Sequence, residues 1–472
     1  MMSTSTNSGN LPPSYPLIGS LAAILANRDR PIQWTSDILL ASPSSTFILQ
    51  RPFGEESVLT SNPINVKHML ETNFSVYQKG ETFRNTLSDL FGDGMFLSDG
   101  KKWKSQRQAM SHAFDSEAFF RYYQTLVSTE LNEQLLPILS SAAANKTILD
   151  LQDILERFGL DTTCQVACGY DAKSLVPSLP HSEIKLAFHD SLQIVNQRLA
   201  EISPLVWKTK KLLNIGSEKQ LREGITRIRN LIKERVTNKI DEYNKNNSLK
   251  SLDFLSLLIM SGQSDKIFLE DSVINFILAG MESTSAVLTW YFWLLSNNPD
   301  VENRILEEIK ICSELNTNLV YTYASIYESM RLYPSVPVDS REAIEDDEFP
   351  DGTRVKKGSR VSYHNYAMGR SENLWGADWP SFNPDRWLAK NEDTGKVTLI
   401  LRDSFIYPEF HAGPRACMGK DMAVWKMMTV ASGILQQFHV ASALEEGVEP
   451  HYISFFNSKM EGGFPVNVKE RA

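Results

Sequence analysis

Residues 408–423 read PEFHAGPRACMGKDMA, and they place Cys417 among glycines, a proline and an arginine. The chain has four cysteines: Cys164, Cys168, Cys312 and Cys417. Four in 472 residues are too few for the disulfide framework of a secreted protein and favour a reducing compartment. A free cysteine is most often a small buried hydrophobe, but Gly413, Pro414 and Gly419 predict a tight loop that a core cysteine does not need. The stretch therefore indicates a cysteine held in place for chemistry.

Three familiar kinds of site fit this loop poorly. A phosphate-binding loop is excluded, because five residues separate Gly413 from Gly419 and Asp421 follows Lys420 where magnesium needs a Ser or Thr. A structural zinc site needs several Cys or His ligands at short spacing, and only His411 is near. A cysteine nucleophile with His411 as its base has no supporting pattern around it.

A thiolate ligand to haem iron explains more of the stretch. Such a sulfur must be held rigidly and sheltered from water. Gly413 and Gly419 allow the backbone to wrap closely around Cys417. Arg415 can offer paired donors to a haem propionate, and Phe410 can cover the sulfur. The helix expected directly after the loop would stabilise the negative sulfur through its N-terminal dipole.

Composition limits the remaining possibilities. The chain is 42% hydrophobic and 22% charged, as in ordinary globular proteins, and long polar linkers are missing. A net charge of −9 argues against a nucleic-acid partner. Residues 1–16 are rich in Ser, Thr, Asn and Pro and are expected to form a flexible lead-in, with residues 17–472 as one large domain. The run LAAILA is far shorter than the ~20 residues of a spanning helix, so no transmembrane anchor or signal peptide is expected there.

Hydrophobic periodicity predicts a mainly α fold with a minor β portion at both ends. Residues 64–310 repeat apolar side chains three and four apart, as in LDLQDILERFGLDTTCQVACG. Polar breaks at 245–250 and 261–266 are expected to be loops between helices. Residues 45–61 suit a small hairpin, and Pro-Asp-Gly at 350–352 predicts a turn between short strands.

The stretch 269–300 is apolar nearly all round, which predicts a helix through the centre of a large protein. Asn275 and Glu282 make it a poor membrane span. Gly280 costs the helix about 1 kcal/mol relative to Ala. A tolerated penalty beside a buried acid suggests a functional role for this segment.

The segment FHAGPRACMG, from Phe410 to Gly419, matches the haem-binding signature of the cytochrome P450 superfamily, F-x-x-G-x-R-x-C-x-G, at every defined position. Further motifs resemble the family's in the right order: WKSQR (103–107), AGMES (279–283), ESMR (328–331) and FNPDRW (382–387). The resemblance implies a single large domain around a buried haem b, with Cys417 as the axial ligand of the iron.

The resemblance also assigns roles to residues outside the cysteine loop. Trp103 and Arg107 would reach the haem propionates, although simple helix packing with a solvated charge is the alternative. Arg341 occupies a place where the family often puts another propionate ligand. A buried structural network is implied for three charged residues: Glu328, Arg331 and Arg386. The remaining Cys and His residues of interest are expected to be structural: Cys164, Cys168, His364 and His411.

On the central helix the resemblance points to oxygen activation. Glu282 and Ser283, with Thr284 next, would supply protons, and Gly280 would let the helix open for oxygen and water. The alternative for Glu282 is a buried acid satisfied by backbone or by a distant Arg. Ser283 stands where the family usually has Thr, and it lacks the methyl group that restricts the side-chain rotamer. Weaker coupling of electron use to product is therefore expected.

Within the superfamily, PSYPLIGS, YQKGETF and RLYPSVPVDSREAIEDDEFPDGTRVKKG resemble the plant clan of fatty-acid ω-hydroxylases, and the branch that also oxidises jasmonoyl-isoleucine and some steroid side chains. This implies insertion of one oxygen atom from O₂ into a C–H bond, an NADPH-cytochrome P450 reductase as electron donor, and a monomer on the cytosolic face of the endoplasmic reticulum. Lys420 and Lys426 could meet the reductase's acidic face, although lone lysines are more often simply solvated.

Several alternatives stay open. The lipid could be a fatty acid, a jasmonate conjugate or a sterol side chain, bound by residues 83–97, 185–205, the central helix, 336–340 and 455–458. An isomerase or dehydratase using the same haem is disfavoured, because such enzymes often lose the acid–alcohol pair. An inactive haem-binding relative remains possible, since the segment 311–327 is shorter than in close relatives.

Overall fold

The computed structural model describes residues 11–201, 203–311, 319–391, 393, 395–445, 447–454 and 456–471. Helices hold 58% of the chain and strands 12%, which confirms a mainly α fold with a minor β portion. The chain divides into two compact units. The first, here called the strand-rich unit, comprises Met1–Gly80, Arg331–Ser381 and Leu401–Cys417; the second, the helical unit, comprises Glu81–Met330, Phe382–Ile400 and Met418–Ala472.

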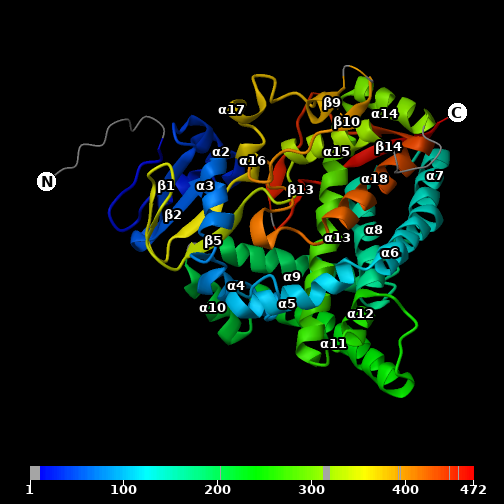
Figure 1. Ribbon diagram of the computed structural model, residues 1–472, viewed down its shortest axis with the longest axis horizontal. Coiled ribbons are helices and arrows are strands. Elements are labelled where there is room, and N and C mark those ends of the chain that lie inside the picture. Colours follow the sequence, from blue (N-terminus) through cyan, green and yellow to red (C-terminus); the bar gives the residue numbers. More distant parts are fainter. Residues whose placement is uncertain are drawn as a thin grey trace. The chain divides into compact units, whose positions relative to one another are not determined.

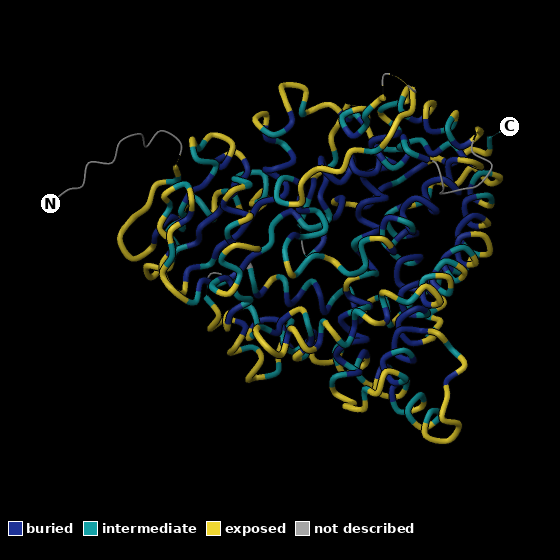
Figure 2. The backbone as a smooth tube through the Cα atoms, viewed as in Figure 1, coloured by how far each residue is buried: buried dark blue, intermediate teal, exposed yellow. Residues whose placement is uncertain are grey.

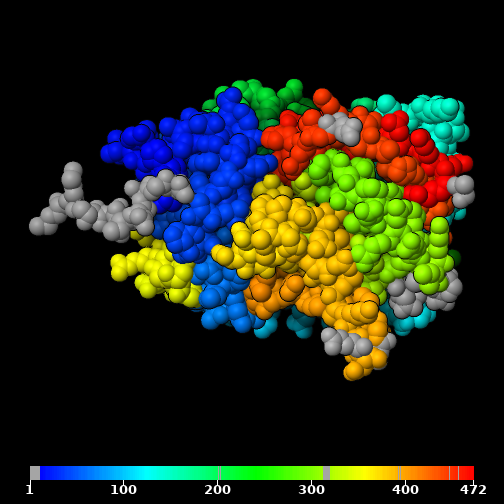
Figure 3. Space-filling model, turned by 90° about the horizontal axis from the view of Figure 1, so that it is seen from above, coloured from blue at the N-terminus to red at the C-terminus, as the bar shows by residue number. Residues whose placement is uncertain are grey.

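A five-stranded sheet in the order β1-β2-β8-β5-β3 organises the strand-rich unit. Its strands are β1 Thr46–Gln50, β2 Glu56–Thr60, β3 Tyr77–Gln78, β5 Asp339–Ala343 and β8 Arg360–Tyr363. β1 and β2 pair antiparallel from Thr46↔Thr60 to Gln50↔Glu56, which confirms the hairpin predicted at 45–61. β2 pairs parallel with β8, so two distant segments of the chain, blue and yellow in Figure 3, lie against each other.

The predicted turn at 350–352 also forms. It joins β6 Asp347–Glu348 to β7 Arg354–Val355, which pair antiparallel. Short helices complete the unit: α1 Leu21–Ala26, α2 Pro31–Ala41, η1 Pro52–Gly54, α3 Pro63–Lys67, η2 His68–Thr72, α16 Asn365–Met368, α17 Glu372–Trp375 and η5 Gly413–Arg415.

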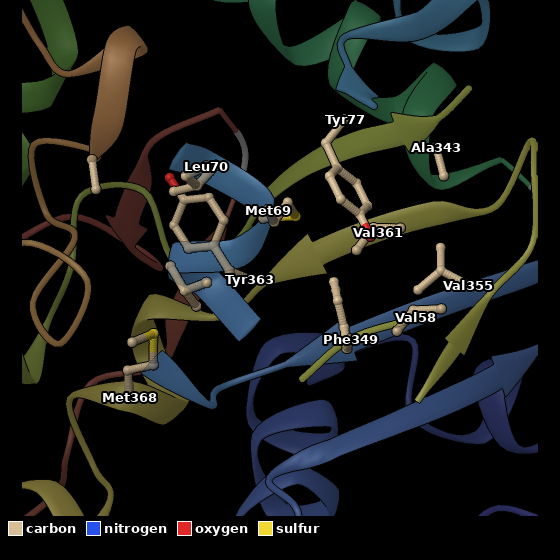
Figure 4. Close-up of a cluster of buried hydrophobic side chains, with 12 residues drawn as sticks. Val58, Met69, Leu70, Tyr77, Ala343, Phe349, Val355, Val361, Tyr363 and Met368 are labelled. Atoms are coloured by element: carbon tan, nitrogen blue, oxygen red, sulfur yellow. The ribbon is translucent and has the colours of Figure 1, made fainter. Parts of the chain in front are cut away.

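One buried apolar cluster supports the cysteine loop (Figure 4). It is made of Val58, Val66, Met69, Leu70, Tyr77, Ala343, Phe349, Val355, Val361, Tyr363, Met368 and Ala412. Leu70 belongs to η2 and Ala412 directly precedes η5, and these two segments pack together. The loop before Cys417 is therefore anchored on the core of its own unit.

Helices of very different lengths build most of the second unit (Figure 1). They are α4 Gly80–Phe91, α5 Gly100–Phe114, α6 Glu117–Glu130, η3 Leu131–Leu135, α7 Leu136–Asn145, α8 Leu151–Cys168, α9 Glu183–Ala200, α10 Pro204–Leu213, α11 Gly216–Asn246, α12 Phe254–Met260, α13 Lys266–Ser296, α14 Pro299–Ile311, α15 Val320–Leu332, η4 Pro384–Trp387 and α18 Lys420–Gln437. α15 continues two residues into the strand-rich unit. The breaks α11–α12 and α12–α13 confirm the loops expected at 245–250 and 261–266.

Small sheets accompany these helices. β11 Phe438–Ser442, β14 Pro465–Glu470 and β4 Leu149–Asp150 form one, in the order β11-β14-β4. β12 Tyr452–Ser454 pairs with β13 Ser458–Met460, and β9 Leu388–Lys390 pairs with β10 Val397–Leu399.

α13 is the central helix of its unit, as the apolar stretch 269–300 predicted. It starts after Asp265, whose side chain accepts hydrogen bonds from the backbone at Ile267 and Phe268, and most of its residues are buried (Figure 2). Among the described residues it alone has the length and apolarity of a membrane span, but 78% of that window is buried inside the protein.

Close packing of α8 on α13 depends on a missing side chain. A Cβ at Gly159 of α8 would lie 2.1 Å from the carbonyl oxygen of Met281. The helices can approach this closely only because Gly159 has no Cβ.

Two sequence-based expectations fall partly outside the described residues. Of the lead-in 1–16, residues 1–10 lie outside, while Tyr15 and Gly19 exchange two backbone hydrogen bonds. Of the short segment 311–327, residues 312–318 lie outside.

Candidate active site

The loop that precedes Cys417 is closed by backbone contacts. The Cys417 N–H donates to the Phe410 carbonyl at 2.8 Å, and the Ala416 N–H donates to the Gly413 carbonyl at 3.0 Å. Gly413 has φ +66°, and a Cβ there would lie 2.2 Å from the Leu70 carbonyl oxygen. Gly413 is therefore required both by its conformation and by the close approach of η2, as a tight loop predicted.

Cys417 is exposed, whereas Cys164 and Cys168 are buried in α8, as expected of core cysteines. Gly419 caps α18 with φ −89°, a conformation open to other residues. The backbone conformation at this position therefore does not require a glycine.

Charged groups gather around Asp339 in the strand-rich unit. Arg341 Nη1 lies 2.9 Å from Asp339 Oδ2, and Lys79 Nζ lies 3.3 Å from Asp339 Oδ1. Arg341 Nη2 also lies 2.5 Å from His411 Nε2, and Arg415 is near enough to act on Lys79 electrostatically. Two cations, Arg341 and Lys79, thus contact one carboxylate, and Arg415 lies close to Lys79, so the cluster has an excess of positive charge that suits an anionic ligand.

The pKa values of this cluster reflect that excess. Burial, Arg341 and Arg415 lower the pKa of Lys79 to about 7. Burial would raise the pKa of Asp339, but Arg341 and Lys79 outweigh it and hold this pKa well below its usual range. Burial lowers the pKa of His411. Sequence reasoning included Arg341 and Arg415 but missed Lys79, although its segment YQKGETF was one of the matching stretches.

Arg415 and Phe410 take defined places in the loop. The Arg415 guanidinium lies 5.9 Å from the centroid of the Phe74 ring. The backbone carbonyl of Phe410 holds the Cys417 N–H, so this residue also shapes the loop through its main chain.

In the helical unit, one face of α13 is open in an otherwise buried helix. Ala279 is exposed, and Gly280 and Ser283 are half-buried, while Glu282 and Thr284 are buried. Ser283 Oγ donates to the Ala279 carbonyl at 2.8 Å, a bond back along its own helix. A hydroxyl therefore lies at the open face, with a buried acid beside it in the sequence.

Thr284 and Gly280 lie on the same stretch of α13, and each has an unusual environment. Thr284 Oγ1 is buried and has no hydrogen-bond partner among the described residues. α13 runs through Gly280 as a continuous helix. A Cβ at Gly280 would lie 2.9 Å from Thr163 Cγ2, and the missing side chain makes room for α8.

Glu282 is an ion-paired buried acid. Its Oε1 lies 3.3 Å from the Nζ of Lys459 on β13. The alternative of a distant cationic partner is thus correct in kind, although the partner is Lys459 and not an arginine. No sequence signal pointed to Lys459, because 177 residues separate the two.

Trp103 and Arg107 lie one turn apart on α5. Trp103 is buried, and the Arg107 guanidinium lies 5.9 Å from the centroid of the Trp103 ring. The pair is pre-arranged within the helical unit, and both the packing and the propionate interpretation are compatible with it.

Two members of the expected structural network, Glu328 and Arg386, are joined. Glu328 is fully buried and accepts hydrogen bonds from Arg386 Nε at 3.0 Å and Trp387 Nε1 at 2.9 Å. Arg331, also fully buried, donates to the carbonyls of Gly369 and Trp379. These are structural roles, and the participation of Trp387 was not predicted.

The structure confirms the prediction for His364 and contradicts the one for Lys426. His364 is structural, since it is buried and its Nδ1 caps α16 at the Ala367 N–H. Lys426 is buried and its Nζ donates to Thr162 Oγ1 at 2.9 Å, so the suggestion that it meets a reductase is wrong.

Each unit thus assembles its own part of the predicted site. The strand-rich unit holds Arg341, Phe410, Gly413, Arg415 and Cys417, and the helical unit holds Trp103, Arg107, Glu282, Ser283, Thr284 and Gly419.

The geometry can be compared with known proteins. The family model for cytochrome P450 matches residues 15–460, which include both halves of the site. The chain belongs to the cytochrome P450 family. It is 48% identical to cytochrome P450 94A2 of Vicia sativa over 99% of this chain and 93% of that protein. It is 48% identical to cytochrome P450 94A1 of Vicia sativa (98% and 91% covered) and 39% identical to cytochrome P450 94B1 of Arabidopsis thaliana (99% and 92% covered).

Membership makes this P450 a haem-iron monooxygenase. The residues present fit that cofactor. In a haem-thiolate site the iron takes a cysteine thiolate, and cations suit the two carboxylates of the haem. An exposed cysteine in a closed glycine loop suits the first, and an excess of buried positive charge in the same unit suits the second.

Proposed function

We propose that this P450 hydroxylates the terminal carbon of a fatty acid or a related lipid, with Cys417 as the axial ligand of the haem iron. The observation that carries the proposal is the closed loop from Phe410 to Cys417, in which Gly413 packs against η2 and leaves the cysteine exposed. When bound, haem supplies the iron at which O₂ is activated.

The chain's own residues hold the cofactor. Arg341 and Arg415, together with Lys79, bind carboxylate groups from the strand-rich unit, and Trp103 and Arg107 do so from the helical unit. Lys79 has a pKa of about 7, which an added carboxylate would raise, so it would carry its full charge in the loaded protein. Phe410 and Gly413 shape the loop, and Gly419 begins the helix that follows it.

Proton delivery is assigned to the open face of α13. Glu282 takes protons and passes them to the hydroxyl of Ser283, and Thr284 offers a second hydroxyl nearby. The half-buried position of Ser283 supports this role, because its Oγ can exchange the Ala279 carbonyl for another acceptor.

An aromatic cluster supports a lipid-like substrate. The Phe91 ring lies 5.8 Å from the ring of Phe96 and 5.3 Å from that of Phe456, measured between centroids. These residues come from two segments, 83–97 and 455–458, that were expected to contact the substrate; Phe455 lies outside the described residues. Apolar rings favour an alkyl chain. The high identity to two P450 94A proteins agrees with the plant clan that the sequence resembles.

The partners follow from the reaction. The electron donor is NADPH-cytochrome P450 reductase, and Lys420 is the remaining candidate for its docking. The protein would act as a monomer, without nucleic acid, at the cytosolic face of the endoplasmic reticulum membrane, with residues 17–472 as the catalytic domain.

The test begins with the reduced, carbon-monoxide-bound holoenzyme. The parent should give the spectrum of a thiolate-ligated haem, and Cys417→Ser should lose it while the matched variant Cys164→Ser keeps it. A parent without that spectrum would refute the thiolate assignment.

Turnover with reductase and NADPH then tests the substrate. Dodecanoic acid should yield the terminal alcohol. Product only from a jasmonoyl conjugate or only from a hydroxysterol would replace the fatty acid in the proposal. No product from any of the three, with a normal spectrum, would favour an inactive relative.

A further inference from the structure

One face of the five-stranded sheet carries a group of polar side chains around Arg360 of β8. In the strand register Arg360 lies opposite Glu342 of β5 and Ser57 of β2, and Ser362 lies opposite Ser340. Register partners share a face of a sheet and successive residues of a strand alternate, so all five side chains belong to the same face. Arg360 Nε donates to Ser340 Oγ at 3.1 Å, and the hydroxyl oxygens of Ser340 and Ser362 lie 2.8 Å apart. The two serines therefore orient the guanidinium group of Arg360.

Arg360 is a cation without a carboxylate of its own. It forms no ion pair with any of the described residues, and its Nη1 and Nη2 have no hydrogen-bond partner among them. The carboxylate of its register partner Glu342 lies against Gly80, where a Cβ would be 2.5 Å from Glu342 Oε2. Arg360 is only half-buried, so a ligand can reach the outer end of the guanidinium group. Two strong donors are therefore available there for an acceptor from outside the protein.

The electrostatic surroundings of Arg360 also favour an anion. Burial and Arg51 lower the pKa of Arg360 to about 10, and Asp339 opposes them only in part. The Asp339 carboxylate already contacts two other cations. Ser57 Oγ is buried and has no hydrogen-bond partner in the described part of the chain. The group thus combines positive charge that the protein does not neutralise with hydrogen-bonding capacity that it does not use.

The place of this group in the sheet points to the substrate as the source of the anion. Ser340 stands between Asp339 and Arg341 in β5, and those two side chains lie on the opposite face, which carries the apolar cluster of Figure 4. An anion at Arg360 is therefore close along the sheet to the cations proposed to hold the haem carboxylates, but the sheet separates the two sites. Ser340 also ends the segment 336–340, which was expected to contact the substrate.

We propose that Arg360 binds the carboxylate of the lipid substrate, and that Ser340 and Ser362 orient its guanidinium group for this contact. The inference rests on the proposed function and narrows the substrate to lipids with an acidic head group. A fatty acid and a jasmonoyl conjugate carry such a group, whereas a hydroxysterol does not. Nη1 and Nη2 can donate parallel hydrogen bonds to the two carboxylate oxygens. Because one end of the substrate is then fixed, Arg360 also helps to select the carbon that is oxidised.

The test compares two ligands of equal chain length on the haem-loaded protein, dodecanoic acid and dodecan-1-ol, at a pH where the acid is ionised. Equilibrium dialysis gives both dissociation constants without turnover. The parent should bind the acid more tightly than the alcohol. Arg360→Met should weaken binding of the acid by about ten- to one-hundred-fold, the range of a charge-assisted hydrogen bond, and leave the alcohol unchanged. Arg360→Lys keeps the charge but loses the paired donors, so it should weaken the acid less.

Two further measurements complete the design. Arg354→Met is the matched control, because Arg354 lies on β7 of the same unit with its side chain 88% exposed, and it should change neither dissociation constant. With reductase and NADPH, Arg360→Met should spread oxidation of dodecanoic acid from the terminal carbon to inner carbons, because the head group is no longer fixed.

The outcomes separate the inference from the proposed function. A parent that forms the terminal alcohol, with both affinities unchanged in Arg360→Met, refutes the inference and keeps the proposed function. Equal weakening of the acid and the alcohol in Arg360→Met would mean that Arg360 is structural and would also overturn the inference. Tighter dialysis binding of inorganic phosphate than of dodecanoic acid, lost in Arg360→Met, would assign the site to a free anion instead. A parent that binds the acid through Arg360 but converts none of it refutes the proposed function and keeps the carboxylate site.

Should Arg360→Met fail to fold or to bind haem, Arg360→Lys decides. An unchanged affinity of this variant for dodecanoic acid overturns the inference, and weaker binding of the acid alone supports it.

Discussion

Lys426 offers a prediction whose size can be worked from the structure. It is 3% exposed in α18, its Nζ donates to Thr162 Oγ1 at 2.9 Å, and it lies 5.4 Å from the centroid of the Phe158 ring. Burial lowers its pKa from the ordinary 10.5 to about 7, and Glu130 only partly opposes this. Below pH 7 the charged ammonium group of Lys426 therefore destabilises the folded helical unit.

The sign and size follow from proton linkage. Between pH 7 and 10.5 the unfolded chain binds this proton more than the folded one does, so stability rises with pH through that window. The difference of 3.5 between the two pKa values corresponds to a cost of about 5 kcal/mol below pH 7. Lys426→Met removes this cost and loses one hydrogen bond worth about 1 kcal/mol. Thr162 keeps its bond to the Phe158 carbonyl.

The expected net gain in the free energy of unfolding is about 4 kcal/mol at pH 6, and it should shrink below about 1 kcal/mol by pH 9.5. At about 2.1 cal/mol/K per residue, a chain of 472 residues gains roughly 1 °C in its thermal midpoint for each kcal/mol. Calorimetry of the haem-loaded protein at both pH values checks this. Lys219→Met on α11, where the lysine is exposed, is the matched control and should change the midpoint little at either pH.

Two results would refute the reasoning. A midpoint difference that is the same at pH 6 and pH 9.5 would mean that Lys426 does not titrate in this range. A lower midpoint for Lys426→Met at pH 6 would mean that Lys426 is a stabilising, charged partner of Glu130. The second result would also revise Glu130, whose pKa is raised to about 8 by burial first and by neighbouring acids after it.

Three further predictions concern the site and its supports. Ser283→Thr should release less peroxide per product, because the added methyl group restricts the hydroxyl's rotamer; unchanged peroxide would contradict the link between this side chain and coupling. Lys79→Met should lose haem faster to an apoprotein acceptor, because one of the cations available to the cofactor's carboxylates is gone, and Lys79→Arg should restore retention; equal loss rates in all three proteins would exclude Lys79 as a ligand. Gly159→Ala should lower the free energy of unfolding by about 1–3 kcal/mol or more, because the new Cβ meets the Met281 carbonyl at 2.1 Å. Chemical denaturation measures that loss, and an unchanged midpoint would show that α8 can shift away from α13.

Short-range features of the fold and site could be predicted, because they depend on neighbours in the chain. The turn through Gly413 to Cys417 closes with hydrogen bonds between residues at most seven apart. The helices α8 and α13 follow the spacing of their apolar residues, and the hairpin β1–β2 follows its turn residues. These features can be predicted because they depend only on local backbone geometry and on the burial of one face of a helix or strand.

Polar side chains in the interior were predicted less well. Periodicity assigned apolar residues to buried faces, but it gave no reason to bury Lys426, which a pattern-based interpretation places in water. Nor did it predict that the missing side chain of Gly280 makes room for Thr163, because the spacing between α8 and α13 is decided by their packing. Both features come from contacts with an element distant in the sequence.

The sequence by itself determined the class of protein and its chemistry: a cysteine loop with every defined residue of its motif, followed along the chain by a helix, and an acid beside a hydroxyl on a central apolar helix. Only the tertiary structure decided the electrostatic setting of these groups. Lys79 meets Asp339 across 260 residues and Lys459 meets Glu282 across 177. Ion pairs of this kind form where packed elements bring charges together out of water, and the order of residues along the chain does not encode that proximity.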